Sequence, residues 1–175
     1  MRRSRRDIGS QDAAVQTNES AEKELGRAKN VAYRYLTYRP RSRAEIEEKL
    51  REKEFDETVI SAVLAGLERL GYVNDREFSR QWAAARIRLR GFGRRRIEQE
   101  LRGKGISRDI IGETLARLFE DAPEKEIALQ EARKKLKSLT RFEPEVRRRR
   151  LAGHLERKGF PTEIIYDVLR QVRER

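Results

Sequence analysis

The sequence predicts an all-α protein, an elongated array of three tandem three-helix modules with a disordered N-terminal tail. One segment reappears twice along the chain at a period near 50 residues, and apolar residues recur at helical spacing with no strand-like alternation. Charged residues make up 41% of the chain and hydrophobic residues 37%. This composition is too polar for one thick core but sufficient for thin helical layers packed in series.

The N-terminal segment predicts the tail, because it holds Gly9, Ser10 and Gln11 and few apolar groups. The modules follow from the repeat described below and from the apolar stripe of a further helix that precedes each pair. The predicted boundaries are 1–20 for the tail, 21–71 for the first module, 72–121 for the second and 122–175 for the third.

The repeat is clearest at residues 42–55, which match residues 93–106 and then 147–160. Within it, the same two apolar places are held by Ile46 and Leu50, by Ile97 and Leu101, and by Leu151 and Leu155. Apolar residues further along each copy keep spacings of one, four and three, which place them on one helical face. Each copy therefore predicts two short helices, and a third helix with its own apolar stripe precedes each pair.

Local signals mark where these helices begin and end. Ser42 and Glu45 form an S-x-x-E capping box at the start of one helix. The turn between the paired helices suits a residue in the left-handed conformation, and Gly105 and Gly159 occupy it in two copies. The first copy holds Glu54 there, at some cost in stability, since a side chain disfavours that conformation.

A second capping box, Asn74 with Glu77, lies between the first and second modules. It predicts a short turn that starts the helix carrying Phe78 and Trp82. Aromatic residues at helical spacing are usually core residues, so both rings are expected in the core. Tyr72 and the residue after it are expected to hold the turn against that core.

The order and spacing of these residues carry further information. The set comprises Tyr35, Leu36, Arg39 to Ser42, Gly71, Tyr72, Val73, Asn74, Asp75, Phe78, Trp82, Arg86, Gly93, Ile97, Leu101, Lys104, Gly105 and Ile106. Over residues 28 to about 172 the chain resembles the RecX family of bacterial recombinase regulators. It departs from the family at Asn74, where aspartate is commoner, and at Glu54, where glycine is usual, and both positions are structural.

The resemblance implies a fold and a function. The fold would be a crescent of three three-helix units lying in the groove of a RecA–DNA filament. The function would be non-enzymatic modulation of the RecA recombinase, with suppression of strand exchange, ATP hydrolysis and co-protease activity. The protein would then regulate homologous recombination, DNA repair and the SOS response.

The net charge of +12 is unevenly distributed. It amounts to +1 for residues 1–27, +1 for 28–71, +4 for 72–121 and +6 for 122–175. A field of this sign attracts polyanions, because each neutralised phosphate releases condensed counterions. Single- and double-stranded DNA are therefore predicted partners, and a merely solvated basic surface is the alternative.

Two arginine segments are the predicted contact sites. The first comprises Arg88, Arg90, Arg94, Arg95 and Arg96, and the second comprises Arg147, Arg148, Arg149 and Arg150. Like charges this close repel by about 0.2 to 0.5 kcal/mol for each helix-neighbour pair, so a polyanionic partner explains them better than stability does. If the modules follow one curved axis, the segments line up along an edge and track a DNA backbone. An ordinary solvated face is the alternative.

Arg86 and Lys104 complete the predicted DNA- and filament-binding set. Arg86 follows Trp82 by one helical turn. An arginine so placed either packs its stem over the aromatic ring and pairs with a carboxylate, or contacts the partner.

Several function classes are disfavoured. The chain has no cysteine and one histidine, His154, which is expected to be exposed, so neither a metal nor another cofactor is predicted. Carboxylates interspersed with basic residues and the lack of a nucleophile set argue against an enzyme. No membrane-spanning or secretory segment is evident, which predicts a cytoplasmic protein, expected to be monomeric. A helix-turn-helix transcription factor, which would require sequence preference, and a scaffold for an acidic protein remain the alternatives.

Overall fold

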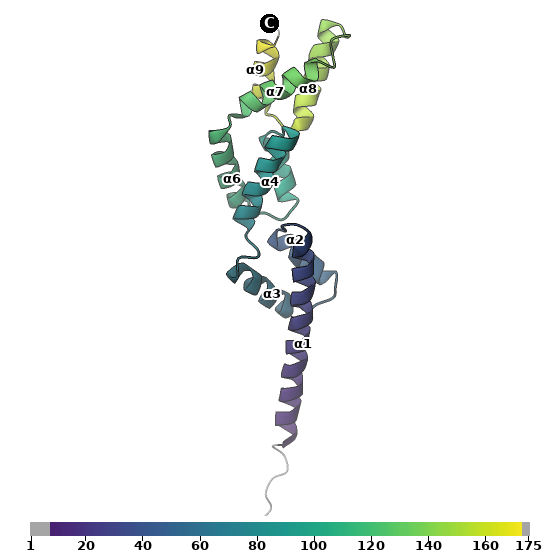
Figure 1. The fold of residues 1–175 in the computed structure, drawn as a ribbon, viewed down its shortest axis with the longest axis vertical. Coiled ribbons are helices and arrows are strands. Elements are labelled where there is room, and N and C mark those ends of the chain that lie inside the picture. Colours follow the sequence, from purple (N-terminus) through teal and green to yellow (C-terminus); the bar gives the residue numbers. More distant parts are fainter. Residues whose placement is uncertain (1–7, 173–175) are drawn as a thin grey trace, which may run out of the picture. The chain divides into compact units, whose positions relative to one another are not determined.

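The computed structural model describes residues 8–172, with side chains from Ser20 onward. Figure 1 shows helices joined by short connections, and no strand occurs within this range. The helices are α1 (Ile8–Tyr38), α2 (Arg43–Arg51), α3 (Glu57–Arg69), α4 (Asp75–Arg90), α5 (Arg94–Arg102), α6 (Arg108–Asp121), α7 (Glu124–Leu136), α8 (Pro144–Lys158) and α9 (Thr162–Gln171). The predicted all-α class and three successive helix triplets are confirmed.

The N-terminal tail was predicted over residues 1–20. Residues 1–7 lie outside the described residues, and α1 begins at Ile8, so this helix extends into the rest of that range.

The chain folds into two compact units, of which one ends at Asn74 and the other begins at Asp75. In the first unit, α1, α2 and α3 enclose a core that includes Ala32, Ile46 and Leu67. Ile46 and Leu50, the apolar pair found in the repeat, are fully buried. Full burial stabilises each such side chain by about 1.5 to 3 kcal/mol relative to exposure.

The second unit contains two helix triplets that share one core. Its buried residues come from both triplets, for example Ile97 and Leu115 from the first and Leu151 and Val168 from the second. The sequence predicted one thin core for each module. The difference arises because Phe160, at the end of the third copy of the repeat, is buried in the same cluster as Ile97.

The capping box and the left-handed turns predicted from the sequence are present in the structure. Ser42 Oγ accepts the Glu45 N–H at 3.2 Å, and a Glu45 carboxylate oxygen accepts the Ser42 N–H at 3.1 Å, which completes the capping box. Glu54 has φ 61°, beside 72° for Gly105 and 86° for Gly159. Among the described residues, Glu54 is the single non-glycine with positive φ, so the glutamate does occupy a left-handed position.

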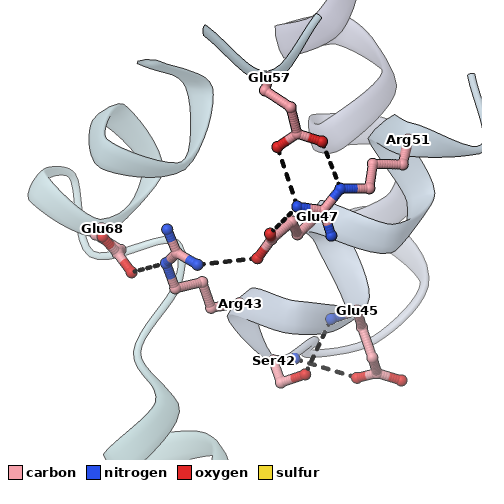
Figure 2. A network of polar contacts seen from close by, with 7 residues as sticks. All are labelled: Ser42, Arg43, Glu45, Glu47, Arg51, Glu57 and Glu68. Carbon is pink, nitrogen blue, oxygen red and sulfur yellow. Dashed lines mark hydrogen bonds and ion pairs between the residues drawn. The ribbon is translucent and has the colours of Figure 1, made fainter. Parts of the chain in front are cut away.

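A polar network joins α2 to α3 in the first unit (Figure 2). Arg43 lies 2.9 Å from Glu47 on its own helix and 3.1 Å from Glu68 at the end of α3. Arg51 contacts Glu47 and lies 2.6 Å from Glu57 at the start of α3. Each arginine thus links two helices at the surface, and such exposed pairs each contribute about 0 to 1 kcal/mol.

Candidate nucleic-acid interface

The first predicted arginine segment lies at a joint between two helices of the second unit. At the start of α5, the Gly93 N–H donates to the Lys158 carbonyl at 2.8 Å, and the Arg95 N–H donates to the Gly159 carbonyl at 3.0 Å. A helix N-terminus has N–H groups without intrahelical partners, and a C-terminus has carbonyls without them. The end of α8 therefore satisfies the beginning of α5, and we call this contact the α5–α8 joint.

Two glycines, Gly93 and Gly159, permit the close approach at the joint. A Cβ atom at Gly93 would lie 2.7 Å from the Gly159 carbonyl oxygen, and one at Gly159 would clash with the backbone nitrogen of Arg96. Nearby, a Cβ atom at Gly91 would clash with the Glu131 carboxylate of α7. Gly91 also has φ +56°, a conformation that side chains disfavour. The loop from Gly91 to Gly93 therefore serves packing between helices.

Glu124, at the start of α7, binds the same helix end. Its carboxylate accepts the Arg94 N–H at 2.6 Å, and the Arg94 side chain lies 3.8 Å from it and 4.9 Å from the Phe119 ring centre. Burial raises the pKa of Glu124, and the N–H and charge of Arg94 offset this only in part. Arg94 is thus engaged inside the unit.

Glu131 anchors the other side of the joint. Its carboxylate lies 2.8 Å from Lys134 and 2.9 Å from Lys158, and Lys158 also donates to the Arg90 carbonyl. Burial alone would raise the pKa of Glu131, but the hydrogen bonds from the two lysines outweigh it, so the pKa lies below its usual value. The carboxylate therefore stays ionised and keeps Lys158 at the joint.

The remaining arginines of this segment differ in their surroundings. Arg96 lies 3.6 Å from Glu100 and 5.6 Å from the Phe92 ring centre. Arg88, Arg90 and Arg95 are exposed, and among the described residues no carboxylate lies within ion-pair distance of them. Three arginines of the segment are therefore available to a partner, whereas Arg94 and Arg96 make ion pairs within the fold.

Trp82 organises a cluster between α4 and α5. Its ring stacks on Phe78 at 5.7 Å, and its N–H donates to Glu100 at 3.0 Å. The Arg86 guanidinium lies 4.0 Å from the indole and its Nε donates to Glu100 at 2.5 Å, while the Lys104 ammonium lies 4.2 Å from the indole. Arg86 thus takes the structural arrangement, stem over the ring and head on a carboxylate. Phe78 is buried, and Trp82 is partly buried against the core.

The turn before α4 requires a correction. Val73 is buried, but Tyr72 is 58% exposed, so the expectation that Tyr72 packs into the core was wrong. Its ring instead meets Tyr33 edge-on at 5.4 Å. Asn74 directly precedes α4 and Asp75 is its first residue, so the helix begins where the capping signal placed it.

The second arginine segment occupies the beginning of α8. Arg148, Arg149 and Arg150 are exposed and Arg147 is half-buried, while the Arg150 guanidinium lies 3.9 Å from the Phe142 ring centre. Its residues are roughly 12 to 16 Å along the helix from the joint, at 1.5 Å per residue. The two segments are therefore held near opposite ends of one helix.

A basic pocket forms where α7 and α8 pack together. Lys135 from α7 joins Arg149, Arg150 and Arg157 around a cavity of about 240 Å³, and among the described residues no carboxylate lines it. None of the four cations has a carboxylate partner in the described part of the chain. The pocket therefore concentrates positive charge that the fold itself does not neutralise.

His154 lies beside this pocket and is half-buried, which corrects the expectation that it is exposed. Burial lowers its pKa, and the charges of Lys158, Lys135 and Arg157 lower it further, against an opposing effect of Glu131. The neutral imidazole is thereby favoured, as expected next to concentrated positive charge.

Sequence reasoning missed Lys135 and Arg157. Arg157 lies two helical turns after Arg149 and Arg150, so helical spacing was a usable signal for it. Lys135 gave no such signal, because its position depends on how α7 packs against α8. Within the described residues no cluster of acidic and histidine side chains could hold a metal, and no helix is long and apolar enough to cross a membrane.

Profiles of the three RecX three-helix domains match this chain in order. The first covers residues 28–67, the second residues 74–115 and the third residues 123–169. The chain belongs to the RecX family. Its helix triplets α1–α3, α4–α6 and α7–α9 are accordingly the three tandem domains of RecX.

Named relatives agree with this assignment. The chain is 33% identical over 150 residues to the regulatory protein RecX of Amycolatopsis mediterranei, covering 86% of this chain and 85% of the relative. It is 38% identical over 146 residues to that of Mycolicibacterium smegmatis, covering 81% and 77%. The crystal structure of RecX from Lactobacillus salivarius matches with a TM-score of 0.79 and 25% identity, covering 88% of this chain and 99% of that one. RecX is a family of regulatory proteins.

Proposed function

We propose that this chain binds the RecA–DNA filament and inhibits the recombinase, its ATPase and its co-protease activity. It would act in the cytoplasm, as a monomer and without catalysis of its own. Membership of the RecX family supports the target, and the basic pocket between α7 and α8 is the observation that carries the DNA contact. Four cations without carboxylate partners fit phosphate groups, to which Arg and Lys bind strongly.

The arginines divide between two roles in this proposal. The exposed Arg148, Arg149 and Arg150 contact the DNA backbone, together with Arg88, Arg90 and Arg95. Arg94 and Arg96 are paired with Glu124 and Glu100 and are not DNA contacts, whereas the backbone hydrogen bonds of the α5–α8 joint keep the two contacting segments at a fixed separation. Arg86 and Lys104 position the Trp82 cluster and reach the partner at most with the edges of their head groups.

The test is RecA ATP hydrolysis on single-stranded DNA with substoichiometric chain added. Arg157→Glu is the test variant and Arg133→Glu is its matched control. Arg133 is exposed on α7, two residues before Lys135 and hence on the far side of that helix. Both changes alter the net charge equally, so their difference reports the pocket alone.

We expect wild type and Arg133→Glu to inhibit ATP hydrolysis alike. Arg157→Glu should need a roughly tenfold higher concentration, the loss of one hydrogen-bonded charge contact. Unchanged ATP hydrolysis at micromolar wild-type chain would reject the proposal. Strong preference for one duplex sequence over unrelated duplexes would favour a transcription factor instead.

A further inference from the structure

A groove of about 620 Å³ lies in the first unit, between α1, α2 and the turn that follows α2. Aromatic rings line it, from Tyr35, Tyr38 and Phe55, and so do the basic side chains of Arg27, Arg34, Lys49 and Lys53. No carboxylate of the described residues lines it. This basic groove lies in a part of the chain, residues 28–71, whose net charge is only +1.

The cations of the groove are only partly neutralised. Lys49 lies 2.5 Å from Glu52, outside the groove lining, and this contact raises the pKa of Lys49. Arg34 and Lys53 are exposed, and in the described part of the chain neither lies within ion-pair distance of a carboxylate. The groove therefore presents positive charge to its occupant.

In the second module, side chains of the module itself fill the position that corresponds to this groove. Trp82 lies there, stacked on Phe78. In the register of the repeat, 51 residues earlier, the corresponding positions hold Val31 and Arg27, which both line the groove. Replacing an indole by an isopropyl group leaves room for a planar ring beside Tyr35 and Tyr38.

The charge next to this position also has opposite signs in the two modules. Glu100 accepts the Trp82 N–H in the second module, and the corresponding residue of the first module is Lys49. The turn lysine is present in both, as Lys104 and Lys53. A site that in one module holds a ring against a carboxylate is thus, in the other, open and basic.

We propose that this groove binds single-stranded nucleic acid, with one unpaired base beside Tyr38 and the flanking phosphates on Arg34 and Lys53. A base is planar and similar in size to an indole, and it comes with the negative charge that the lining lacks. The volume falls within the roughly 300 to 1,000 Å³ of small-ligand sites. Aromatic rings along a basic groove are the usual means of binding single strands without reading sequence.

This site extends the DNA partner of the proposed function to a second surface. Its assay contains no recombinase, so its outcome is independent of the ATPase test. The full chain carries Arg157→Glu throughout, which keeps the α7–α8 pocket from masking the groove. Fluorescence anisotropy compares a labelled oligo(dT) with an abasic oligonucleotide of equal length, which has the same phosphates and no bases.

Tyr38→Ala removes an exposed ring, and Tyr166→Ala, on α9, is its matched control. We expect Tyr38→Ala to weaken oligo(dT) binding by about fivefold or more and to leave abasic binding nearly unchanged, because stacking alone is lost. Val31→Trp, which supplies the ring of the second module, should have the same effect with an unchanged melting temperature. Arg34→Glu should weaken both oligonucleotides more than Arg69→Glu, an exposed change on α3.

Equal binding of oligo(dT) by Tyr38→Ala, Val31→Trp and Tyr166→Ala would overturn the proposal. If the first two variants then lost association with recombinase filaments, the occupant of the groove would be a protein segment. Loss of abasic binding by Tyr38→Ala would likewise reject the stacking role.

Discussion

Position 54 shows how one residue departs from its own repeat. Glu54 occupies the left-handed conformation that glycine occupies in the other two copies. An L-residue pays roughly 1 to 2 kcal/mol for that conformation, partly offset because glycine loses more backbone freedom on folding. The turn forms nonetheless, since the buried pair Ile46 and Leu50 holds the preceding helix in place.

Glu54→Gly is therefore expected to stabilise the chain by about 0.5 to 1 kcal/mol. Lys53→Gly, one residue earlier and without a positive φ, is the control and should destabilise it. Urea unfolding followed by circular dichroism measures both. A lower unfolding midpoint for Glu54→Gly would contradict the assignment of strain to this turn.

Between elements, the α5–α8 joint links the two helix triplets of the second unit through backbone hydrogen bonds. N–H groups at the beginning of α5 donate to carbonyls at the end of α8, and Gly93 and Gly159 allow the close approach. Glu124 and Glu131 tie the neighbouring side chains to it. The joint connects two modules of the repeat, which share one core.

Gly93→Ala should destabilise the second unit by about 1 to 3 kcal/mol, the usual cost of overpacking, because its Cβ meets backbone at 2.7 Å. Gly112→Ala is the control: it lies within α6 with open space around it and should stabilise by about 0.5 to 1 kcal/mol. The fluorescence of Trp82, the single tryptophan, follows unfolding of this unit. Equal stability of the two variants would contradict the joint.

Across the whole molecule, the net charge of +12 is divided between cations that the fold uses and cations that it leaves to a partner. Arg94 and Arg96 belong to the first group, and Arg148, Arg149 and Arg150 to the second. Composition and run length do not separate the groups, since both are runs of three arginines or more. Ion pairing separates them.

Replacing Arg148, Arg149 and Arg150 by alanine should change the melting temperature little, because exposed charges contribute within about 0.5 kcal/mol each. The slope of log binding constant against log salt for single-stranded DNA should shrink by roughly 0.7 per lost phosphate contact. Replacing Arg94 and Arg96 instead should lower the melting temperature and reduce the slope less. If the changes at Arg148, Arg149 and Arg150 lowered the melting temperature and those at Arg94 and Arg96 reduced the salt slope more, the two groups would have the opposite roles.

The sequence alone was sufficient for the helices, their caps, the left-handed turns and the family, because these depend on neighbours along the chain. A capping box spans three residues, and a helical face follows from spacings of three and four. Glu54 and Ser42 were therefore predictable one by one. The apolar positions of the repeat were predictable for the same reason, and Ile46, Leu50, Ile97, Leu101, Leu151 and Leu155 are all buried.

Only the tertiary structure decided which charges and rings meet. Lys135 joins Arg157 because α7 packs on α8, and Arg94 is paired because Glu124 at the start of α7 reaches the beginning of α5. Tyr72 turns away from the core toward Tyr33, which no spacing indicates. The physical reason is that contacts between helices depend on packing angles and side-chain volumes summed over the fold, whereas contacts within a helix depend on a fixed rise and turn per residue.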